Sequence, residues 1–218
     1  HLIEPMPGVG VFLATVKGWL GEDATLIYED LHKSITETTE HRIDAETVKT
    51  RLAKIGHHFQ KHPLKIAIVT SSIAYEAHIV LSEVFRIIRL QMQSWRLSEI
   101  RKKKLIKIFS DYNQVLDCVV TASDSSEIRL KPHRDLYSLA LHQLGIHKHD
   151  FDKVIGFEDS ESGTIAIRAA GIGLCVAVPF ADTQGHRLEH ASYVLHGGLP
   201  EAMVVHQLFL KEIRDNSE

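Results

Sequence analysis

The chain has 218 residues, of which 44% are hydrophobic and 24% are charged, a composition typical of a folded globular protein rather than a disordered one. Lysine and arginine total 25 against 28 acidic residues, so the net charge of −3 does not indicate a nucleic-acid-binding protein. No apolar run approaches the roughly 18 residues of a membrane helix, and no signal-peptide pattern opens the chain. Cys118 and Cys175 both lie in apolar, strand-like runs, so we expect reduced core thiols in a cytoplasmic protein.

The N-terminal half contains helical patterns and one strand. Residues 11–44 are ambiguous, residues 45–59 show helical periodicity, and residues 65–70 form an apolar run that ends in a hydroxyl-rich turn. A long helical pattern follows over 75–109, and its basic run at 101–104 is typical of the exposed face of an amphipathic helix. The first residue is His1 rather than Met, so we expect a fragment, a processed form or an expression product.

The C-terminal half alternates strands and helices. Strands are predicted at 116–121, 154–157, 174–178 and 193–195, and helices at 136–144, 165–170 and 203–213. Short connections between such elements favour a parallel sheet with helices on its faces. We therefore predict an α/β, Rossmann-like fold that forms one domain over 1–218, with helical insertions at about 11–60 and 75–109.

Polar side chains follow three of the predicted strands. They are Thr70, Ser71 and Ser72 after the first strand, Lys131 after the second, and Glu158 and Asp159 after the third. Ligands of open α/β sheets bind outside the carboxyl ends of the strands, so we expect these groups to converge. Hydroxyls and a lysine suit phosphate oxygens, while carboxylates suit Mg²⁺. The set therefore predicts a site for a phosphate and a magnesium ion.

These stretches also carry a family resemblance. Ile-Val-Thr-Ser-Ser at 68–72, Leu-Lys-Pro-His-Arg-Asp-Leu-Tyr at 130–137 and Gly-Phe-Glu-Asp-Ser-Glu-Ser-Gly at 156–163 resemble, in chain order, motifs II, III and IV of the haloacid dehalogenase-like (HAD) superfamily. The closest resemblance is to its β-phosphoglucomutase-like phosphatase branch. Glu-Pro-Met-Pro-Gly-Val at 4–9 is similar to the segment where that branch returns from its helical cap to the core.

The resemblance implies a role for each phosphate-binding residue. Thr70 would contact the transferred phosphoryl group, with assistance from Ser71 and Ser72. Lys131 would neutralise both the phosphate and the nucleophile. In this family an aspartate nucleophile forms an aspartyl-phosphate, and stabilisation of the phosphoryl charge supplies most of the catalysis.

The resemblance also implies a cofactor and partners. Glu158 and Asp159 would hold Mg²⁺, with Asp159 the more direct ligand. The substrate would be a small phosphorylated metabolite, such as a sugar phosphate, and the family's cap would select it. We expect neither a nucleic-acid nor a membrane partner, and a homodimer through the helical insertions is one option.

The chain departs from the family at motif I. We find no Asp-x-Asp that follows an apolar strand, although that motif supplies the nucleophile and its strand is central in the family's sheet. Three interpretations stay open: a fragment of a longer HAD-like enzyme, a catalytically silent binding or interaction protein, or a degenerate motif I at 25–30 that places Glu29 or Asp30 near the metal.

Each candidate also has a purely structural interpretation. The hydroxyls at 70–72 can act as a helix N-cap, Lys131 can be a solvated loop residue, and the acids at 158–159 can cap the next helix. The fifteen histidines include groups at ligand-like spacing, namely His57, His58 and His62, His147 and His149, and His186 and His190. No group has a matching second set at zinc-finger distance, so we interpret them as surface or loop residues.

Overall fold

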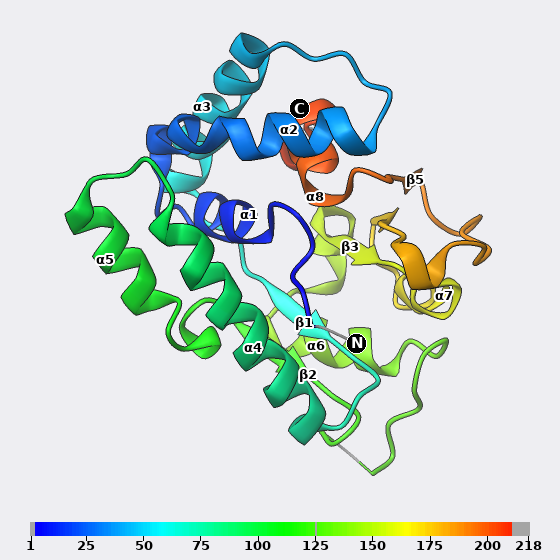
Figure 1. Cartoon of the computed structure of the whole chain (residues 1–218). Coiled ribbons are helices and arrows are strands. Elements are labelled where there is room, and N and C mark those ends of the chain that lie inside the picture. The colour runs from blue at the N-terminus through cyan, green and yellow to red at the C-terminus, as the bar shows by residue number, and fades with distance from the viewer. Residues whose placement is uncertain (1–2, 125, 211–218) are drawn as a thin grey trace. The chain divides into compact units, whose positions relative to one another are not determined.

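The computed structural model describes residues 3–124 and 126–210. These residues fold into two compact units (Figure 1). The first unit contains residues 3–65, 79–115 and 197–210, and the second contains 66–78 and 116–196. Each unit has its own buried apolar side chains. The single domain expected over 1–218 stays a prediction.

The first unit is helical. Its elements are α1 (Val9–Val16), α2 (Tyr28–Thr38), α3 (Ala45–Lys61), most of α4 (Ala74–Gln93), α5 (Glu99–Ile108) and α8 (Gly198–Pro200), with 3₁₀ turns at Gly21–Ile27 and Tyr112–Gln114 and a π-helix at Glu201–Val205 (Figure 1). Residues 11–60 and 75–109 are therefore largely helical.

Helix α3 shows why this unit packs tightly. Asp44 caps it by accepting a hydrogen bond from the Thr47 N–H at 2.8 Å. Its apolar side chains recur at helical spacing and are fully buried, namely Val48, Leu52, Ile55 and Phe59. Gly56 lies on the same face, and a Cβ there would be only 1.9 Å from the carbonyl oxygen of Gly21. The absence of a side chain at Gly56 thus allows α3 to approach the 3₁₀ turn closely.

The long helix predicted over 75–109 is wrong, because the chain forms two helices there. Helix α4 ends at Gln93, and α5 begins after Ser98, whose hydroxyl accepts a hydrogen bond from the Arg101 N–H at 3.4 Å. Between them Trp95 and Leu97 are buried. Burial of two large side chains in the turn, together with a Ser N-cap, favours a break over a continuous helix.

The degenerate motif I needs a strand near residue 25, and the structure contradicts it. Residues 21–27 form a 3₁₀ helix, and α2 begins at Tyr28. Leu31 and Ile35 are fully buried on α2 and lie four positions apart. This spacing is typical of a helix and not of a strand. Glu29 and Asp30 lie in the exposed first turn of that helix.

The helix predicted over 203–213 is also only partly correct. Met203 lies within the π-helix, a break follows at Gln207 with φ of +49°, and residues 208–210 are helical again. Positions 211–213 lie outside the described residues.

The second unit is mixed α/β, with two parallel sheets rather than the one sheet expected. Strand β1 (Ala67–Val69) pairs with β2 (Cys118–Val120), while β3 (Ile155–Glu158), β4 (Leu174–Ala177) and β5 (Tyr193–Val194) form the other sheet. Helices α6 (Asp135–Gln143) and α7 (Glu161–Ala169) accompany them (Figure 1). Within the described residues, no strand pairs β1 with β3.

Helix α6 supplies side chains to the cores beside both sheets. Leu136 and Ala140 pack with Val120 of β2. Tyr137, one position further round the helix, packs in the cluster that contains Cys175 of β4. The helix therefore joins the two sheets into one unit, and it brings Tyr137 to the carboxyl ends of the strands.

The two cysteines are free thiols, as predicted. Burial raises the pKa of Cys175 to about 11, and burial also raises the pKa of Cys118. Both side chains therefore stay protonated at neutral pH and are poor nucleophiles. Among the described residues, no helix combines the length and the apolar character needed to cross a membrane.

We predict that Gly56→Ala destabilises the protein by about 1–3 kcal/mol, because the added methyl group would clash with the carbonyl of Gly21. At an ordinary helix position the same change stabilises a protein by about 0.5–1 kcal/mol. The sign of the change in unfolding free energy therefore distinguishes a tightly packed glycine from an ordinary one. Urea denaturation followed by circular dichroism measures it. Lys54→Ala, on the exposed face of α3, is the control and should change stability by no more than about 0.5 kcal/mol. A gain of stability in Gly56→Ala would contradict the packing described.

Candidate functional site

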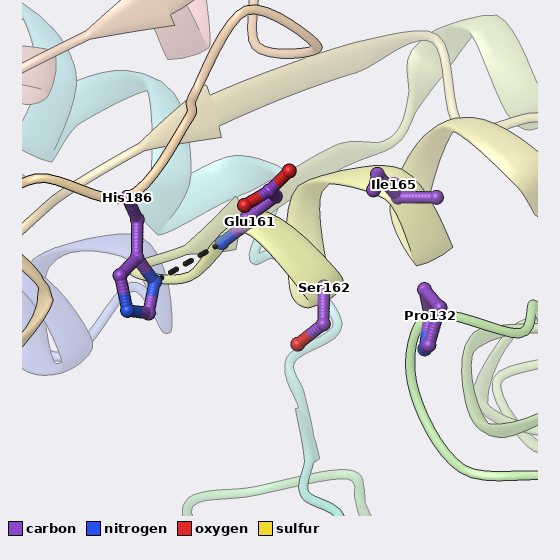
Figure 2. Close-up of a pocket in the computed structure, with 5 residues that line it drawn as sticks. All are labelled: Pro132, Glu161, Ser162, Ile165 and His186. Carbon is purple, nitrogen blue, oxygen red and sulfur yellow. Dashed lines mark hydrogen bonds between the residues drawn. The ribbon is translucent and has the colours of Figure 1, made fainter.

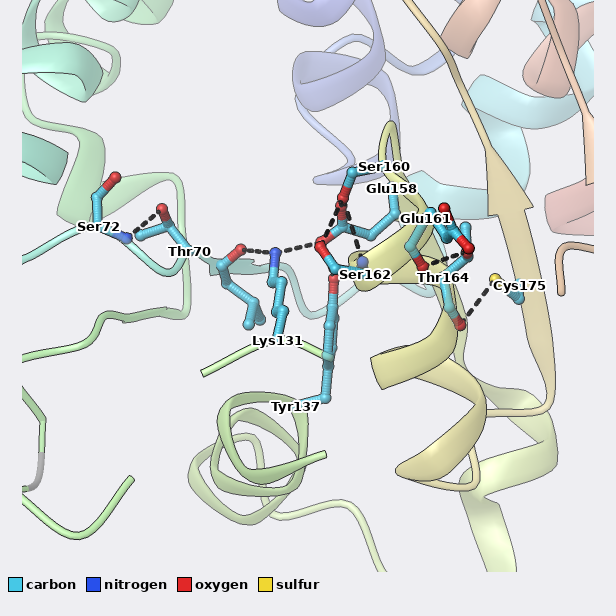
Figure 3. A network of polar contacts seen from close by, with 12 residues as sticks. Thr70, Ser72, Lys131, Tyr137, Glu158, Ser160, Glu161, Ser162, Thr164 and Cys175 are labelled. Atoms are coloured by element: carbon cyan, nitrogen blue, oxygen red, sulfur yellow. Dashed lines mark hydrogen bonds and ion pairs between the residues drawn. The ribbon is translucent and has the colours of Figure 1, made fainter. Parts of the chain in front are cut away.

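The turn after β1 presents the three predicted hydroxyls in different environments. Thr70 continues the strand pairing, since its N–H donates to the carbonyl of Val120 at 2.9 Å. Its hydroxyl oxygen accepts a hydrogen bond from the Ser72 N–H at 3.1 Å, which closes a tight turn (Figure 3). Ser71 is exposed, whereas Thr70 and Ser72 are half-buried. Thr70 is thus the most firmly positioned of the three hydroxyls.

Lys131 connects the ends of the two sheets. Its Nζ donates to the carbonyl of Val69, the last residue of β1, at 3.0 Å, and it also forms an ion pair with Glu158, the last residue of β3 (Figure 3). The side chains of Lys131 and Glu158 are only 12% and 6% exposed. Lys131 therefore forms a buried ion pair with one of the two acids it is expected to approach, Glu158.

Tyr137 completes the environment of Glu158, although no sequence pattern assigns it a role. Its hydroxyl donates to the same carboxylate oxygen that Lys131 contacts, and Ser160 donates to the other oxygen at 3.3 Å. Burial and the negative charge of Glu158 raise the pKa of Tyr137 far above its ordinary value, so the phenol stays a donor. Only its position six residues after Lys131, on the inner face of α6, could have identified it.

Glycine at position 163 makes room for this carboxylate. A Cβ there would lie 2.1 Å from the carboxyl group of Glu158. The first turn of α7 can therefore lie against the carboxylate, and Ser160 caps that turn by accepting a hydrogen bond from the Gly163 N–H at 3.1 Å. Ser160, rather than the acids at 158–159, therefore caps α7.

Asp159 differs from Glu158 in forming no ion pair with another described residue. Burial is the largest cause that raises the pKa of its carboxyl group, the charge of Glu158 adds to the effect, and Lys131 opposes it. An ionised Asp159 is therefore costly in the folded protein, and a nearby cation would offset that cost.

The donor set fits Mg²⁺ at one of the two predicted acids. Mg²⁺ binds one or two carboxylates and completes its shell with water and phosphate oxygen, which Asp159 satisfies. Glu158 already accepts from Lys131 and Tyr137, so its role as a ligand stays a prediction. Within the described part of the chain, neither acid belongs to a cluster of three or more metal-ligating side chains.

An open pocket of about 350 Å³ borders these residues. It is lined by Pro132, Glu161, Ser162, Ile165 and His186 (Figure 2). Pro132 follows Lys131 directly, and the Nδ1 of His186 accepts from the Glu161 N–H at 3.4 Å. The volume of this pocket is in the range of small-molecule binding sites.

An Asp-x-Asp sequence does occur at Asp150 and Asp152, but not at a strand end. Both residues lie in the 3₁₀ helix Lys148–Lys153, ahead of β3, and Asp150 pairs with Lys153 at 2.9 Å and with His149 at 3.1 Å. These contacts assign the pair to the surface of the unit rather than to the strand ends that carry the site.

No family model matches the chain, and no curated protein matches it in sequence. The structure is similar to a crystal structure described as a candidate β-phosphoglucomutase from Thermotoga maritima, with 20% identity, coverage of 95% of this chain and 94% of that chain, and a TM-score of 0.45. This is a structural similarity at low sequence identity.

Two structures of CbbY from Rhodobacter sphaeroides are also similar, both at 16% identity. The one in complex with phosphate covers 86% of this chain and 87% of that chain, with a TM-score of 0.35. The mutant in complex with xylulose-1,5-bisphosphate covers 87% and 88%, with a TM-score of 0.36. All three TM-scores are below 0.5.

We predict that Lys131→Met destabilises the protein by about 3–5 kcal/mol, because it leaves the buried Glu158 carboxylate without its cation. Lys131→Met/Glu158→Gln should recover much of the loss, since no buried charge is then left unpaired. Lys153→Met, which breaks an exposed pair, should cost no more than about 1 kcal/mol. Urea denaturation measures all three, and equal effects of Lys131→Met and Lys153→Met would contradict a buried pair.

We also predict that Asp159→Asn stabilises the metal-free protein at pH 7. The folded-state pKa of Asp159 lies above its ordinary value of 3.8, so the folded protein holds the proton more tightly than the unfolded chain. Stability from this group is full below pH 3.8 and is lost as pH rises through the folded-state pKa. Asn removes that loss, so the difference between variant and wild type should grow with pH.

Denaturation curves measured with EDTA from pH 3 to pH 8 provide the test. Asp182→Asn, at an exposed position, is the control and should follow the wild type throughout. Parallel curves for Asp159→Asn and the wild type would contradict the perturbed carboxyl group.

Proposed function

We propose that the second unit binds the phosphoryl group of a small phosphorylated metabolite together with Mg²⁺, and that the protein acts in phosphoryl transfer as a HAD-like phosphatase or phosphomutase. The observation that supports this most is the position of Lys131, which contacts Val69 and Glu158 at the carboxyl ends of β1 and β3, while Asp159 follows Glu158 directly in the chain. A fixed ammonium group and a carboxylate that favours a cation, at one edge, suit a phosphate that carries a divalent ion.

Lys131 can contact a phosphate without giving up its structural role. An ammonium group has three N–H donors, and two of them are directed at Val69 and Glu158. The third can donate to a phosphoryl oxygen, while the positive charge offsets the negative charge that spreads over the group during transfer.

The turn after β1 supplies a second donor. Because the Thr70 oxygen accepts from the Ser72 N–H, its own O–H can donate outward to a phosphoryl oxygen. Ser71, which is exposed in the same turn, is placed to add a hydroxyl or its N–H.

Asp159 would hold the magnesium ion directly. When bound, the ion would neutralise part of the negative charge of the phosphoryl group. Binding of the ion would also remove the cost of ionising Asp159, so Mg²⁺ and the deprotonated carboxylate favour each other.

A binding protein without turnover is the second candidate. The observation that favours it is that Lys131 pairs with Glu158, a residue held by Tyr137, rather than with a carboxylate placed for nucleophilic attack. Such a protein would retain phosphate and Mg²⁺ binding but would not hydrolyse phosphate esters.

We predict that the protein hydrolyses p-nitrophenyl phosphate only with Mg²⁺, and that Asp159→Asn lowers kcat/KM by about 100-fold, the size of effect seen when one stabilising group is lost. Thr70→Val, which removes one hydroxyl of nearly the same shape, should lower it by about 10-fold. Lys153→Met should leave it unchanged. Calorimetry with inorganic phosphate and MgCl₂ measures binding in the same samples.

The outcomes separate the two candidates. Phosphate binding that Asp159→Asn weakens, without hydrolysis, would favour the binding protein. Hydrolysis or phosphate binding that neither Asp159→Asn nor Lys131→Arg changes would contradict the site itself.

A further inference from the structure

A second group of side chains that can bind a metal ion lies in the helical unit. These residues belong to none of the sequence motifs described above. Nε2 of His41 is 3.0 Å from Oε1 of Glu201, and Nε2 of His206 is 3.2 Å from the same oxygen. The ligand atoms of all three residues lie within 4.8 Å of one another. In the described part of the chain, it is the one such group of three or more.

The carboxylate at the centre is buried and fixed. The side chain of Glu201 is only 7% exposed, and its second oxygen accepts a hydrogen bond from the Gly197 N–H at 2.8 Å. A Cβ on Gly197 would lie 2.9 Å from that oxygen, so glycine permits the approach. A backbone donor that orients a carboxylate in this way is the kind of outer contact that metal ligands have in proteins.

The backbone that carries Glu201 is unusual and is held in place. Residues Glu201–Val205 form a π-helix, a conformation that is rare and often found at functional sites. Arg51 of α3 donates to the carbonyl oxygens of Val204 and Val205 at 2.8 and 3.0 Å. The wider turn places Glu201 and His206, five positions apart, on the same side.

The two imidazoles approach the carboxylate from different directions. Their rings lie edge to face, with centroids 5.4 Å apart and an interplanar angle of 86°. Both Nε2 atoms lie within hydrogen-bonding distance of one oxygen, Oε1 of Glu201. Ligand atoms of a tetrahedral zinc ion, bound at about 2.0–2.1 Å, lie about 3.3 Å apart, close to two of these separations.

We propose that His41, Glu201 and His206 form a binding site for a divalent transition-metal ion of the zinc type. Two imidazole nitrogens and one carboxylate oxygen suit Zn²⁺, Co²⁺ or Ni²⁺, whereas Mg²⁺ and Ca²⁺ favour sets made of oxygen alone. The side chain of His41 is 42% exposed, so an ion can enter from solvent and water can complete its shell.

The ion would link two parts of the helical unit that are far apart in sequence. His41 lies in the connection between α2 and α3, and Glu201 is 160 residues further along the chain. A metal that binds only the folded arrangement stabilises it, and the stabilisation grows with the logarithm of metal concentration once that concentration exceeds the dissociation constant. The site is independent of the phosphate-binding proposal, because its residues lie in the other unit and favour a different class of metal.

The test uses the full chain, without an affinity tag, after dialysis against EDTA. We expect calorimetry to show one Zn²⁺ bound per chain, with a melting temperature that rises with Zn²⁺ but not with Mg²⁺. His41→Ala should weaken Zn²⁺ binding at least tenfold, and because His41 is at the surface this variant should fold. His206→Ala and Glu201→Gln should have at least the same effect. With Co²⁺, the visible spectrum should show the intense bands of a four-coordinate site.

The matched controls are the other histidine groups. His58 and His62 have ring centroids 5.1 Å apart, and those of His147 and His149 are 5.6 Å apart. His58→Ala and His149→Ala should bind Zn²⁺ as the wild type does. The proposal is overturned by binding only at millimolar Zn²⁺, by binding that His41→Ala and His206→Ala leave intact, or by loss of binding in either control.

Discussion

The buried ion pair between Lys131 and Glu158 is the interaction on which the second unit depends. Removal of two charges from water is costly, and the cost is recovered only where good geometry and further hydrogen bonds satisfy both groups. Here the carbonyl of Val69, the hydroxyl of Tyr137 and the hydroxyl of Ser160 supply those bonds. Because the pair spans the ends of β1 and β3, it holds together two sheets that share no strand pairing within the described residues.

The same pair influences what the site can bind. A phosphoryl group at this edge would share Lys131 with Glu158, so the affinity for phosphate depends on how much of the lysine's charge the carboxylate has already offset. Asp159 brings a complementary constraint, since its ionised form gains from a cation. At the proposed site, phosphate and Mg²⁺ together would therefore bind better than either would alone.

The two proposed metal sites differ in chemistry as well as in place. Asp159 offers a single oxygen ligand in the α/β unit, which suits a hard ion that keeps most of its water. His41, Glu201 and His206 offer nitrogen and oxygen ligands in the helical unit, which suits a softer ion. Each can be studied by its own metal, with the other site as an internal reference.

The sequence by itself determined the type of most elements and the order of the polar strand ends. The runs around residues 67–69, 118–120 and 155–158 form strands, and α3, α6 and α7 have apolar residues at helical spacing. Both patterns depend only on residues that are close together in the sequence. The break between α4 and α5 was missed, since it depends on the burial of Trp95.

Only the tertiary structure decided which side chains meet. Lys131 and Glu158 are 27 residues apart, and Tyr137 joins them because α6 packs against both sheets. His41 and Glu201 are 160 residues apart, and a π-helix that no local pattern predicts brings them together. Spacing along the chain groups only histidines that are at most five residues apart. Contacts of this kind follow from how buried surfaces pack, and packing is a property of the folded chain rather than of any short stretch of it.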